Sequence, residues 1–398
     1  MEAPKRLAVK LNSKAERSVK QGHPWIFSDS ILKIKEGGKT GDLAILFDSK
    51  TDKAFAIGLF DADSPIRIKV IHHDGPAKID EAFFKNKLEH AFELRKPLLR
   101  TNTNAYRLLF GENDGFPGLI VDVYNKVGVL KLYSAIWFPY LEMIIPHIVA
   151  IAKLDCLILR LSRSLEKSDA PYEEGTILYG ALENPEVEFV EYGVRFKTDV
   201  LLGHKTGFFL DHRENRRRIG KLSKGKTVLD VFSYAGGFSI HALAGGAKEV
   251  TSLDLSKQAL ELAKQNAELN KPTGKHFTIA GDAFEELKTL IRQEKKYDVV
   301  IIDPPSFAKS QAENEIAKKK YVELTEIGIQ LTEKGGLLLL ASCSSRVTEE
   351  ELREIHKSVF WRLGVNYTLE DFTQHDIDHP IGFAEGAYLK SGYYRINK

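Results

Sequence analysis

The feature that most constrains this chain is a regular alternation of short apolar segments and amphipathic segments after about residue 191. Apolar runs bounded by turn residues predict strands, and the segments between them have helical spacing. Such alternation is typical of a parallel, doubly wound α/β sheet. Strands are predicted over 227–232, 249–254, 276–280, 297–303 and 336–341, and helices over 238–244, 257–269, 284–294 and 318–331. The tail predicts two more strands, 365–372 and 388–396, paired as a hairpin at the sheet edge.

The first 190 residues have a different pattern and predict two further domains. Residues 1–72 contain four apolar or alternating runs separated by turn residues, which indicates a small β-rich module. Residues 73–190 mix helical spacing over 81–99 and 138–151 with strand patterns over 106–111, 119–124, 127–133 and 156–161. We therefore expect a central α+β domain, followed by the α/β domain over 191–398.

Composition excludes several classes of protein. The chain has 398 residues, and its 57 Lys and Arg nearly balance its 55 Asp and Glu, so a wholly basic arm is not expected. Two cysteines, Cys156 and Cys343, cannot build a disulfide framework or a cysteine-based zinc site, and no metal site is predicted. We see no uninterrupted run of about 18 apolar residues and no apolar core of a signal peptide. These features predict a cytoplasmic protein without a membrane span.

Small or acidic residues follow the predicted strands at the edge where open α/β sheets bind ligands. The first strand leads into the turn Phe232-Ser233-Tyr234-Ala235-Gly236, which would let a ligand approach the backbone at a helix N-terminus. The turn lacks the G-x-G-x-x-G spacing of dinucleotide binders. Asp254 closes the second strand and could accept hydrogen bonds from ribose hydroxyls. Asp282 and Ala283 follow the third strand, and Asp282 could bind an exocyclic amine.

The fourth and fifth strands end in the segments that suggest chemistry. Asp303-Pro-Pro-Ser-Phe307 follows the fourth strand, and its prolines remove two backbone donors. Cys343 follows the fifth strand. A thiolate that adds to carbon 6 of a pyrimidine makes carbon 5 nucleophilic enough to accept a methyl group, and Asp303 could stabilise that adduct. We therefore predict that Cys343 and Asp303 are catalytic, whereas Cys156 lies in an apolar run and is expected in the core.

A basic segment precedes the glycine turn. Residues 204–226 contain eight Lys or Arg and two acidic residues. A solvated helix face would account for such a charge run, but aromatic residues beside it, Phe208 and Phe209, also suit contact with RNA. We expect Lys205 and Arg213 here, together with Phe307 after the prolines, to bind substrate. The basic N-terminal module would contact phosphates.

The whole chain resembles the bacterial PUA-domain-containing class I methyltransferases that make 5-methylcytosine in 23S rRNA. The segments that resemble this family run from end to end: Gly22–Phe27, Asp114–Asp122, Lys205–Arg216, Phe232–Phe238, Asp303–Phe307, Ser342–Ser344 and Glu385–Lys390. The resemblance implies an N-terminal PUA domain, a central α+β domain and a Rossmann-like C-terminal domain.

The resemblance also implies the cofactor and its contacts. S-adenosylmethionine would bind with its amino-acid end at residues 232–236, its ribose at Asp254 and its adenine at Asp282 and Ala283, beside Asp303. The partner would be 23S rRNA or a large-subunit precursor. The base that removes the carbon-5 proton and the oligomeric state, for instance a homodimer, stay open.

Two other functions compete with this interpretation. A related guanine-N7 rRNA methylase shares the Phe-Leu-Asp-His-Arg segment and the Asp-Pro-Pro turn but has no cysteine at the position of Cys343. A non-catalytic assembly factor would bind S-adenosylmethionine without turnover. Ser306 departs from amino-group methylases, which carry an aromatic residue there, and from a second cytosine-5 family, which carries a cysteine.

Overall fold

In the computed structural model, which describes residues 3–34, 37–307 and 311–397, the chain forms two compact units. Unit 1 contains residues 1–189, 198–210 and 377–386, and unit 2 contains residues 190–197, 211–376 and 387–398. The chain therefore changes unit five times. Two changes fall within the hairpin of β12 (Glu186–Glu191) and β13 (Val194–Asp199), one follows residue 210, and two lie at the ends of residues 377–386. The three domains with boundaries at 72 and 190 stay a prediction.

Unit 1 begins with a β-rich module. Within the described residues its sheet has six strands in the order β2-β6-β5-β4-β1-β3, and all neighbours are antiparallel except β1 and β4. Its core is aliphatic and includes Val9, Leu46 and Val70. The elements are β1 (Arg6–Leu11), α1 (Ser13–Lys20), β2 (Trp25–Phe27), η1 (Ser28–Ser30), β3 (Ile31–Ile34), β4 (Leu43–Phe47), β5 (Ala54–Phe60) and β6 (Ile66–His72). The expected β-rich module is present, with α1 and two short strands in addition.

The rest of unit 1 is the α+β part, with a sheet ordered β11-β10-β9-β8-β7. Strands β8 and β9 form an antiparallel hairpin, and Cys156 is buried in β10 as expected. The elements are α2 (Glu81–Leu99), β7 (Ala105–Phe110), η2 (Gly111–Asp114), β8 (Leu119–Tyr124), β9 (Val127–Leu132), η3 (Ala135–Tyr140), α3 (Leu141–Ala152), β10 (Cys156–Leu161), α4 (Arg163–Glu166), β11 (Ile177–Gly180) and η5 (Ala384–Gly386).

One segment of unit 1 differs from the expectation about apolar runs. Ala135–Ala152 has a mean hydropathy of 1.6 over 18 residues, which is long and apolar enough to cross a membrane by length and composition alone. Glu142, His147 and two prolines interrupt the run, so the sequence shows no continuous apolar stretch there. Trp137, Leu141 and Ile144 of this segment are fully buried in the core of unit 1. A core helix passes the same test, so the segment is weak evidence for a span.

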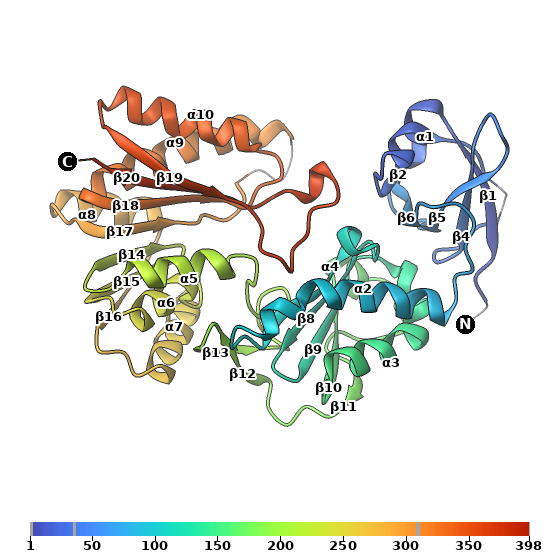
Figure 1. Ribbon diagram of the computed structural model, residues 1–398, viewed down its shortest axis with the longest axis horizontal. Helices are drawn as coiled ribbons and strands as arrows, with labels where there is room; N and C mark the ends of the chain where they lie inside the picture. The colour runs from blue at the N-terminus through green and yellow to red at the C-terminus, as the bar shows by residue number, and fades with distance from the viewer. Residues whose placement is uncertain (1–2, 35–36, 308–310, 398) are drawn as a thin grey trace. The chain divides into compact units, whose positions relative to one another are not determined.

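Unit 2 contains the predicted doubly wound sheet (Figure 1). Within the described residues its seven strands have the order β16-β15-β14-β17-β18-β20-β19, with β20 and β19 as the antiparallel edge pair. Helices α9 and α10 lie on one side of the sheet and α5, α6 and α7 on the other. The strands are β14 (Thr227–Val231), β15 (Glu249–Asp254), β16 (Lys275–Ala280), β17 (Tyr297–Ile302), β18 (Thr332–Ser342), β19 (Tyr367–Thr373) and β20 (Lys390–Ile396). The helices are α5 (Arg213–Leu222), α6 (Gly237–Ala244), α7 (Lys257–Leu269), α8 (Ala283–Arg292), η4 (Gln311–Glu313), α9 (Asn314–Leu331) and α10 (Glu349–Arg362).

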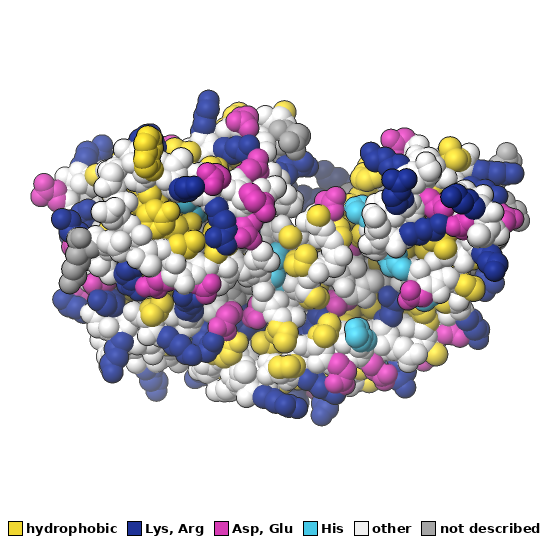
Figure 2. Space-filling model, turned by 45° about the horizontal axis from the view of Figure 1, so that its top comes forward, with side chains coloured by type: hydrophobic (Ala, Val, Ile, Leu, Met, Phe, Trp, Pro, Cys, Tyr) yellow, Lys and Arg dark blue, Asp and Glu magenta, His cyan; other side chains and the backbone are white. Residues whose placement is uncertain are grey.

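The central strands of this sheet are buried on both faces. Val299–Ile302 of β17 and Leu337–Ala341 of β18 are continuous apolar runs, because helices cover both sides of a parallel sheet. On the outside, basic and acidic side chains are interspersed over the face shown in Figure 2. This distribution fits the nearly balanced charge of the chain.

A buried ion pair in unit 1 gives a stability prediction. Arg95 is fully buried, and its guanidinium donates to both carboxylate oxygens of Asp114 at 2.9 and 2.6 Å and to the carbonyl of Asp378 at 3.1 Å. Asp114→Asn leaves that charge without its counter-charge. We expect unit 1 to lose about 3–5 kcal/mol of unfolding free energy, measured by urea unfolding with tryptophan fluorescence, since Trp137 is fully buried in this unit.

The matched control is Glu93→Gln on the same helix, α2. Glu93 pairs with Lys96 at the surface, where an ion pair contributes about 0–1 kcal/mol. Equal losses in the two variants would contradict the role assigned to Arg95 and Asp114.

Candidate active site

The candidate site lies at the carboxyl edge of the unit 2 sheet. Strand β14 pairs in parallel with both β15 and β17, and β17 pairs in parallel with β18. The chain order reverses at β14, so the turns after β14 and β17 diverge, which is where open α/β sheets bind ligands. Within the described residues this edge carries the glycine turn, Asp254, Asp303 and Cys343, each from a different strand.

The turn after β14 has an unusual backbone. Phe232 and Tyr234 have φ of 63° and 48°, a region that residues with a side chain rarely adopt. Gly236 has φ of 78°, and a Cβ there would lie 2.9 Å from the Cβ of Ala263 on α7. Ser233 is held by its N–H, which donates to the carbonyl of Leu253 at 3.0 Å. This backbone path turns the chain sharply into α6 and brings its N-terminus to the sheet edge.

Two carboxylates support this turn. Asp254 is half-buried and accepts the Tyr234 N–H at 2.8 Å on one oxygen and the Ser256 N–H at 2.8 Å on the other. Each oxygen keeps a lone pair for another donor. Asp230 is buried and accepts the N–H and the hydroxyl of Ser239, at 3.0 and 2.7 Å. Asp230 of β14 therefore holds the start of α6, and Asp254 at the end of β15 holds the glycine turn through Tyr234.

Asp282 takes the ordinary role of a helix cap. Its Oδ1 accepts the N–H groups of Phe284 and Glu285, at 3.0 and 3.3 Å, and the residue is exposed at the start of α8. Ala283 is buried behind it. The cap uses one oxygen and fixes the direction of the side chain at the same edge.

Asp303 and His212 form a pair that the sequence did not predict. His212 Nε2 lies 3.2 Å from Asp303 Oδ2, and His212 is buried. The other oxygen, Oδ1, is buried and has no hydrogen-bond partner among the described residues. Burial lowers the pKa of His212, but the charge of Asp303, assisted by Asp211, outweighs burial and leaves that pKa raised. The histidine therefore holds one oxygen of Asp303 and leaves Oδ1 with unused hydrogen-bonding capacity.

The thiol of Cys343 meets the Asp-Pro-Pro turn. Its Sγ donates to the carbonyl oxygen of Pro304 at 3.5 Å, across 39 residues of sequence, and the residue is half-buried. Behind it, the hydroxyl of Tyr321 on α9 lies 2.8 Å from the hydroxyl of Ser342. The two segments that the sequence assigned to catalysis thus lie side by side.

Of the predicted substrate contacts, Phe307 lies near this edge. Its ring packs against Tyr321 with centroids 5.4 Å apart, and Lys320 Nζ lies 4.8 Å from its centroid. Phe307 is half-buried. Lys205 is exposed but belongs to unit 1, where its Nζ lies 4.8 Å from the centroid of Phe209.

Arg213 does not lie at a surface. Its side chain is fully buried, and it pairs with Asp376 at 2.8 Å and lies 3.9 Å from Glu191. The neighbouring Arg216 is also buried and binds both oxygens of Glu191 at 2.7 Å. The structure therefore does not support a substrate contact by Arg213. Arg213 and Arg216 of the basic segment can be buried because Glu191, which is distant in sequence, compensates their charge.

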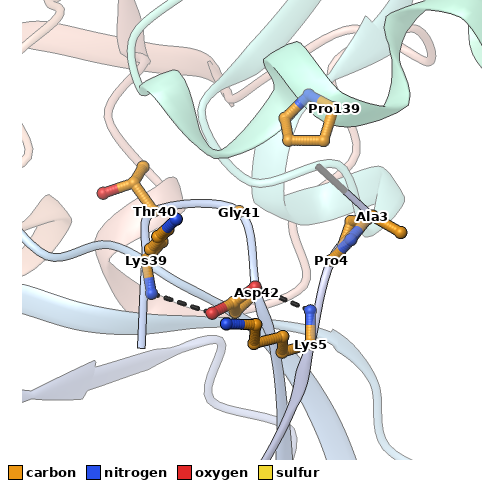
Figure 3. A pocket seen from close by; sticks show the side chains of 8 residues that line it. All are labelled: Ala3, Pro4, Lys5, Lys39, Thr40, Gly41, Asp42 and Pro139. Atoms are coloured by element: carbon orange, nitrogen blue, oxygen red, sulfur yellow. Dashed lines mark hydrogen bonds between the residues drawn. The ribbon is translucent and has the colours of Figure 1, made fainter. Parts of the chain in front are cut away.

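A second depression lies in unit 1, lined by residues 3–5, 39–42 and Pro139 (Figure 3). Its central carboxylate, Asp42, accepts the backbone N–H groups of Lys5 and Lys39 at 2.7 and 2.8 Å. These bonds close the turn before β4. Asp42 therefore has a structural role in this turn, which makes the depression a weaker candidate for a functional site than the sheet edge.

Comparisons with known proteins agree with this geometry. Residues 174–354 match the model of an S-adenosylmethionine-dependent methyltransferase family, and residues 9–73 match a PUA-like domain. A ribosomal RNA large subunit methyltransferase from Deinococcus radiodurans is 41% identical over 98% of both chains. The ribosomal RNA large subunit methyltransferase I of Aeromonas salmonicida is 35% identical over 94% of this chain and 96% of its own. The chain belongs to this methyltransferase family.

The family membership confirms the fold, the enzyme class and the cofactor. The protein is an S-adenosylmethionine-dependent methyltransferase with an N-terminal PUA-like domain. A solved methyltransferase-like protein from Streptococcus mutans has the same fold, with a TM-score of 0.83 at 23% identity over 98% of this chain and 100% of its own.

Asp230 of this methyltransferase gives a pH prediction. Burial, opposed by the Ser239 hydrogen bonds and assisted by the charges of Asp303 and Asp254, raises its pKa to about 7. The unfolded carboxyl titrates near 4, so between about pH 4 and 7 the folded state holds a proton that the unfolded state has released. Stability therefore falls as pH rises through this window. Asp230→Asn should flatten the curve, so that the loss of unfolding free energy between about pH 5 and 8 shrinks by up to ~3 kcal/mol.

The measurement is urea unfolding followed by circular dichroism at both pH values. Glu261→Gln, an exposed change on α7, is the control and should keep the wild-type slope. A slope in Asp230→Asn equal to that of wild type would contradict a carboxyl that stays protonated into the neutral range.

Proposed function

We propose that this enzyme methylates carbon 5 of a cytosine in large-subunit (23S) ribosomal RNA, with Cys343 as nucleophile. The observation that carries the proposal is the 3.5 Å approach of the Cys343 thiol to the Pro304 carbonyl. This contact joins the thiol to the Asp303-Pro304-Pro305 turn, at the edge where open α/β sheets bind ligands. Support for the substrate comes from relatives named as ribosomal RNA large subunit methyltransferases.

The residues at the edge fit S-adenosylmethionine. The buried Ser233 hydroxyl has no partner among the described residues, and a ligand in the turn would supply one. We assign the amino-acid end of the cofactor to residues 232–236, which lead into the α6 N-terminus, and its ribose to Asp254. The adenine end falls to Asp282 and Ala283. The carboxyl groups of Asp254 and Asp303 at this edge suit a cationic sulfonium.

The chemistry follows from the weakness of carbon 5 as a nucleophile. Bound S-adenosylmethionine supplies an electrophilic methyl group. The Cys343 thiolate forms a bond to carbon 6, and the electron pair of the carbon 5–carbon 6 double bond attacks the methyl carbon, whose bond to sulfur breaks with its pair left on sulfur. A base then takes the carbon-5 proton while the bond from carbon 6 to Sγ breaks. This step restores the ring and the thiolate.

Asp303 is placed to stabilise the adduct. Addition at carbon 6 raises the electron density on the pyrimidine ring, and a partner at the ring edge that holds or delivers a proton lowers the barrier. The buried Oδ1 lacks a partner among the described residues, while Oδ2 faces His212. We therefore assign Oδ1 to the pyrimidine edge and His212 to positioning the carboxylate.

The RNA contacts outside the ring are assigned by side-chain type. Phe307 offers an aromatic face beside the Asp-Pro-Pro turn, and RNA-binding proteins commonly stack an extruded base on such a ring. Lys205 of unit 1 stays a predicted substrate contact, and the basic residues of the PUA-like domain stay predicted phosphate contacts. Arg213 is not assigned, because it is buried.

Replacing the nucleophile tests the proposal. Cys343→Ala removes the thiol without adding bulk, so we expect methyl transfer to rRNA to fall by at least ~10³-fold while S-adenosylmethionine still binds. The measurement is incorporation of labelled methyl into rRNA from a strain that lacks this gene. Cys156→Ala, the matched control, removes the buried thiol of β10 and should keep turnover within a few-fold. Unchanged turnover in Cys343→Ala would favour a purine-nitrogen methylase, which needs no thiol.

A second prediction tests the cofactor assignment. Asp254→Ala removes the ribose acceptor and both hydrogen bonds that fix the turn, so S-adenosylmethionine affinity should fall about 10–100-fold. Isothermal titration calorimetry measures the affinity, with Glu261→Gln on the neighbouring helix as control. If both variants bind equally well, Asp254 does not hold the ribose. Wild-type binding without turnover on any rRNA would instead indicate a non-catalytic assembly factor.

A further inference from the structure

A buried lysine stands beside the proposed nucleophile. Lys390 begins β20 and lies directly opposite Ser342 in the antiparallel register with β18, so it neighbours the residue before Cys343. The residue is 3% exposed. Lysine is rarely buried unless its charge is compensated, so its position at this edge requires a physical reason.

Hydrogen bonds account for part of that reason. Lys390 Nζ donates to the carbonyl oxygens of Ser344 and Val347, at 2.6 and 2.5 Å. Both belong to the turn that carries the chain from Cys343 into α10. An ammonium group has three donors, and these two carbonyls engage two of them. The lysine therefore fixes the turn that follows the thiol and holds a positive charge next to it.

The surrounding charges favour the cationic form of this lysine. Burial lowers the pKa of Lys390 to about 8, while Cys343 and two of the acidic residues of α10, Glu349 and Glu351, act in the opposite direction. At neutral pH the group is thus mainly an ammonium. Glu349 and Glu351 also pair with Arg353 and Lys318, so their charge is shared.

The thiol itself has a neighbour that opposes ionisation. The Pro304 carbonyl accepts from Sγ–H, and a carbonyl oxygen beside sulfur favours the neutral thiol over the thiolate. Asp303 and Tyr321 also face this region, and the carboxylate adds negative charge. A nearby cation is therefore needed if the sulfur is to react as a thiolate near neutral pH.

We propose that Lys390 is the positioning residue that keeps Cys343 in its reactive thiolate form, by holding the adjacent turn and by supplying the neighbouring positive charge. The Sγ–H proton leaves to water, the thiolate forms next to the ammonium, and Lys390 keeps its own proton throughout. The significance of this pair for catalysis rests on the proposed function. The existence of the Lys390–Cys343 pair does not depend on that function, because the reactivity of the thiol can be measured without RNA.

The test measures alkylation of Cys343 by iodoacetamide in the full chain without RNA, from about pH 6 to 9.5, with peptide mass spectrometry. Lys390→Met keeps most of the apolar stem and removes the charge. We expect its alkylation rate at pH 7 to be about tenfold below wild type, with the midpoint of the pH curve moved up by about one unit. Lys390→Arg retains a cation and should restore most of the rate, which a purely structural role would not predict. Equal rates in wild type and Lys390→Met overturn the proposal.

Cys156 provides an internal control for folding. It is buried in β10, so its labelling in a variant reports unfolding. If Lys390→Met is unfolded by this criterion, the wild-type curve decides: a midpoint near 8.5, the ordinary value for a free thiol, overturns the proposal, and a midpoint at least one unit lower supports it.

Kinetics separate this inference from the proposed function. With rRNA as substrate, Lys390→Met should lower kcat about tenfold and leave KM for RNA within about twofold, since the lysine is buried and acts through the thiol. A shifted alkylation curve in an enzyme that forms no 5-methylcytosine would leave the lysine–cysteine pair standing and refute the cytosine-5 reaction. Formation of 5-methylcytosine with an unshifted alkylation curve would support the cytosine-5 reaction and overturn the role of Lys390.

Discussion

The site depends on parallel pairing of four strands, β15, β14, β17 and β18. Parallel strands end at the same edge, so four turns far apart in sequence meet there, and hydrogen bonding between strands fixes their spacing. Helices on both faces bury the strands, which makes this frame rigid. This frame sets the positions of the glycine turn, Asp254, Asp303 and the thiol of Cys343. A shift in the register of β18 would separate Cys343 from the Asp-Pro-Pro turn.

Electrostatics then divide this edge into two environments. Around the start of α6, buried and half-buried carboxylates dominate, and their mutual repulsion contributes to the raised pKa of Asp230. Around Cys343, Lys390 supplies positive charge, and the acidic Glu349 and Glu351 interact with it. The first environment suits a cationic methyl donor, and the second suits an anionic sulfur. In the proposed mechanism the cationic methyl donor thus lies near acidic groups, and the anionic sulfur lies near a positive charge.

Much of the fold could be predicted because its signals are local. Strands β17 and β18 contain continuous apolar runs, and the helices between the strands show their own periodicity. The predicted positions of β14 to β18 therefore match the structure within a few residues. Helix α10 was missed, although Thr348 and Glu351 form a capping box at its start. Helix α5 was interpreted through its charge alone.

The parts of the site that sequence could not supply are those that depend on contacts distant in sequence. Arg213 seemed a substrate contact because nothing nearby in sequence shows that Glu191 and Asp376 neutralise it. Likewise, the pairing of His212 with Asp303 and the place of Lys390 opposite Ser342 arise from packing and strand register. Sequence predicts which residues follow a strand, whereas their protonation depends on neighbours that only the fold brings together.

The most direct test of this account is the identity of the methylated nucleoside. Purified enzyme, labelled S-adenosylmethionine and rRNA from a strain lacking this gene would be incubated, and the digested nucleosides separated by mass spectrometry. The account predicts that the label appears in 5-methylcytidine. Label in a methylated purine would contradict it, leaving the fold and the cofactor in place but removing the catalytic role of Cys343.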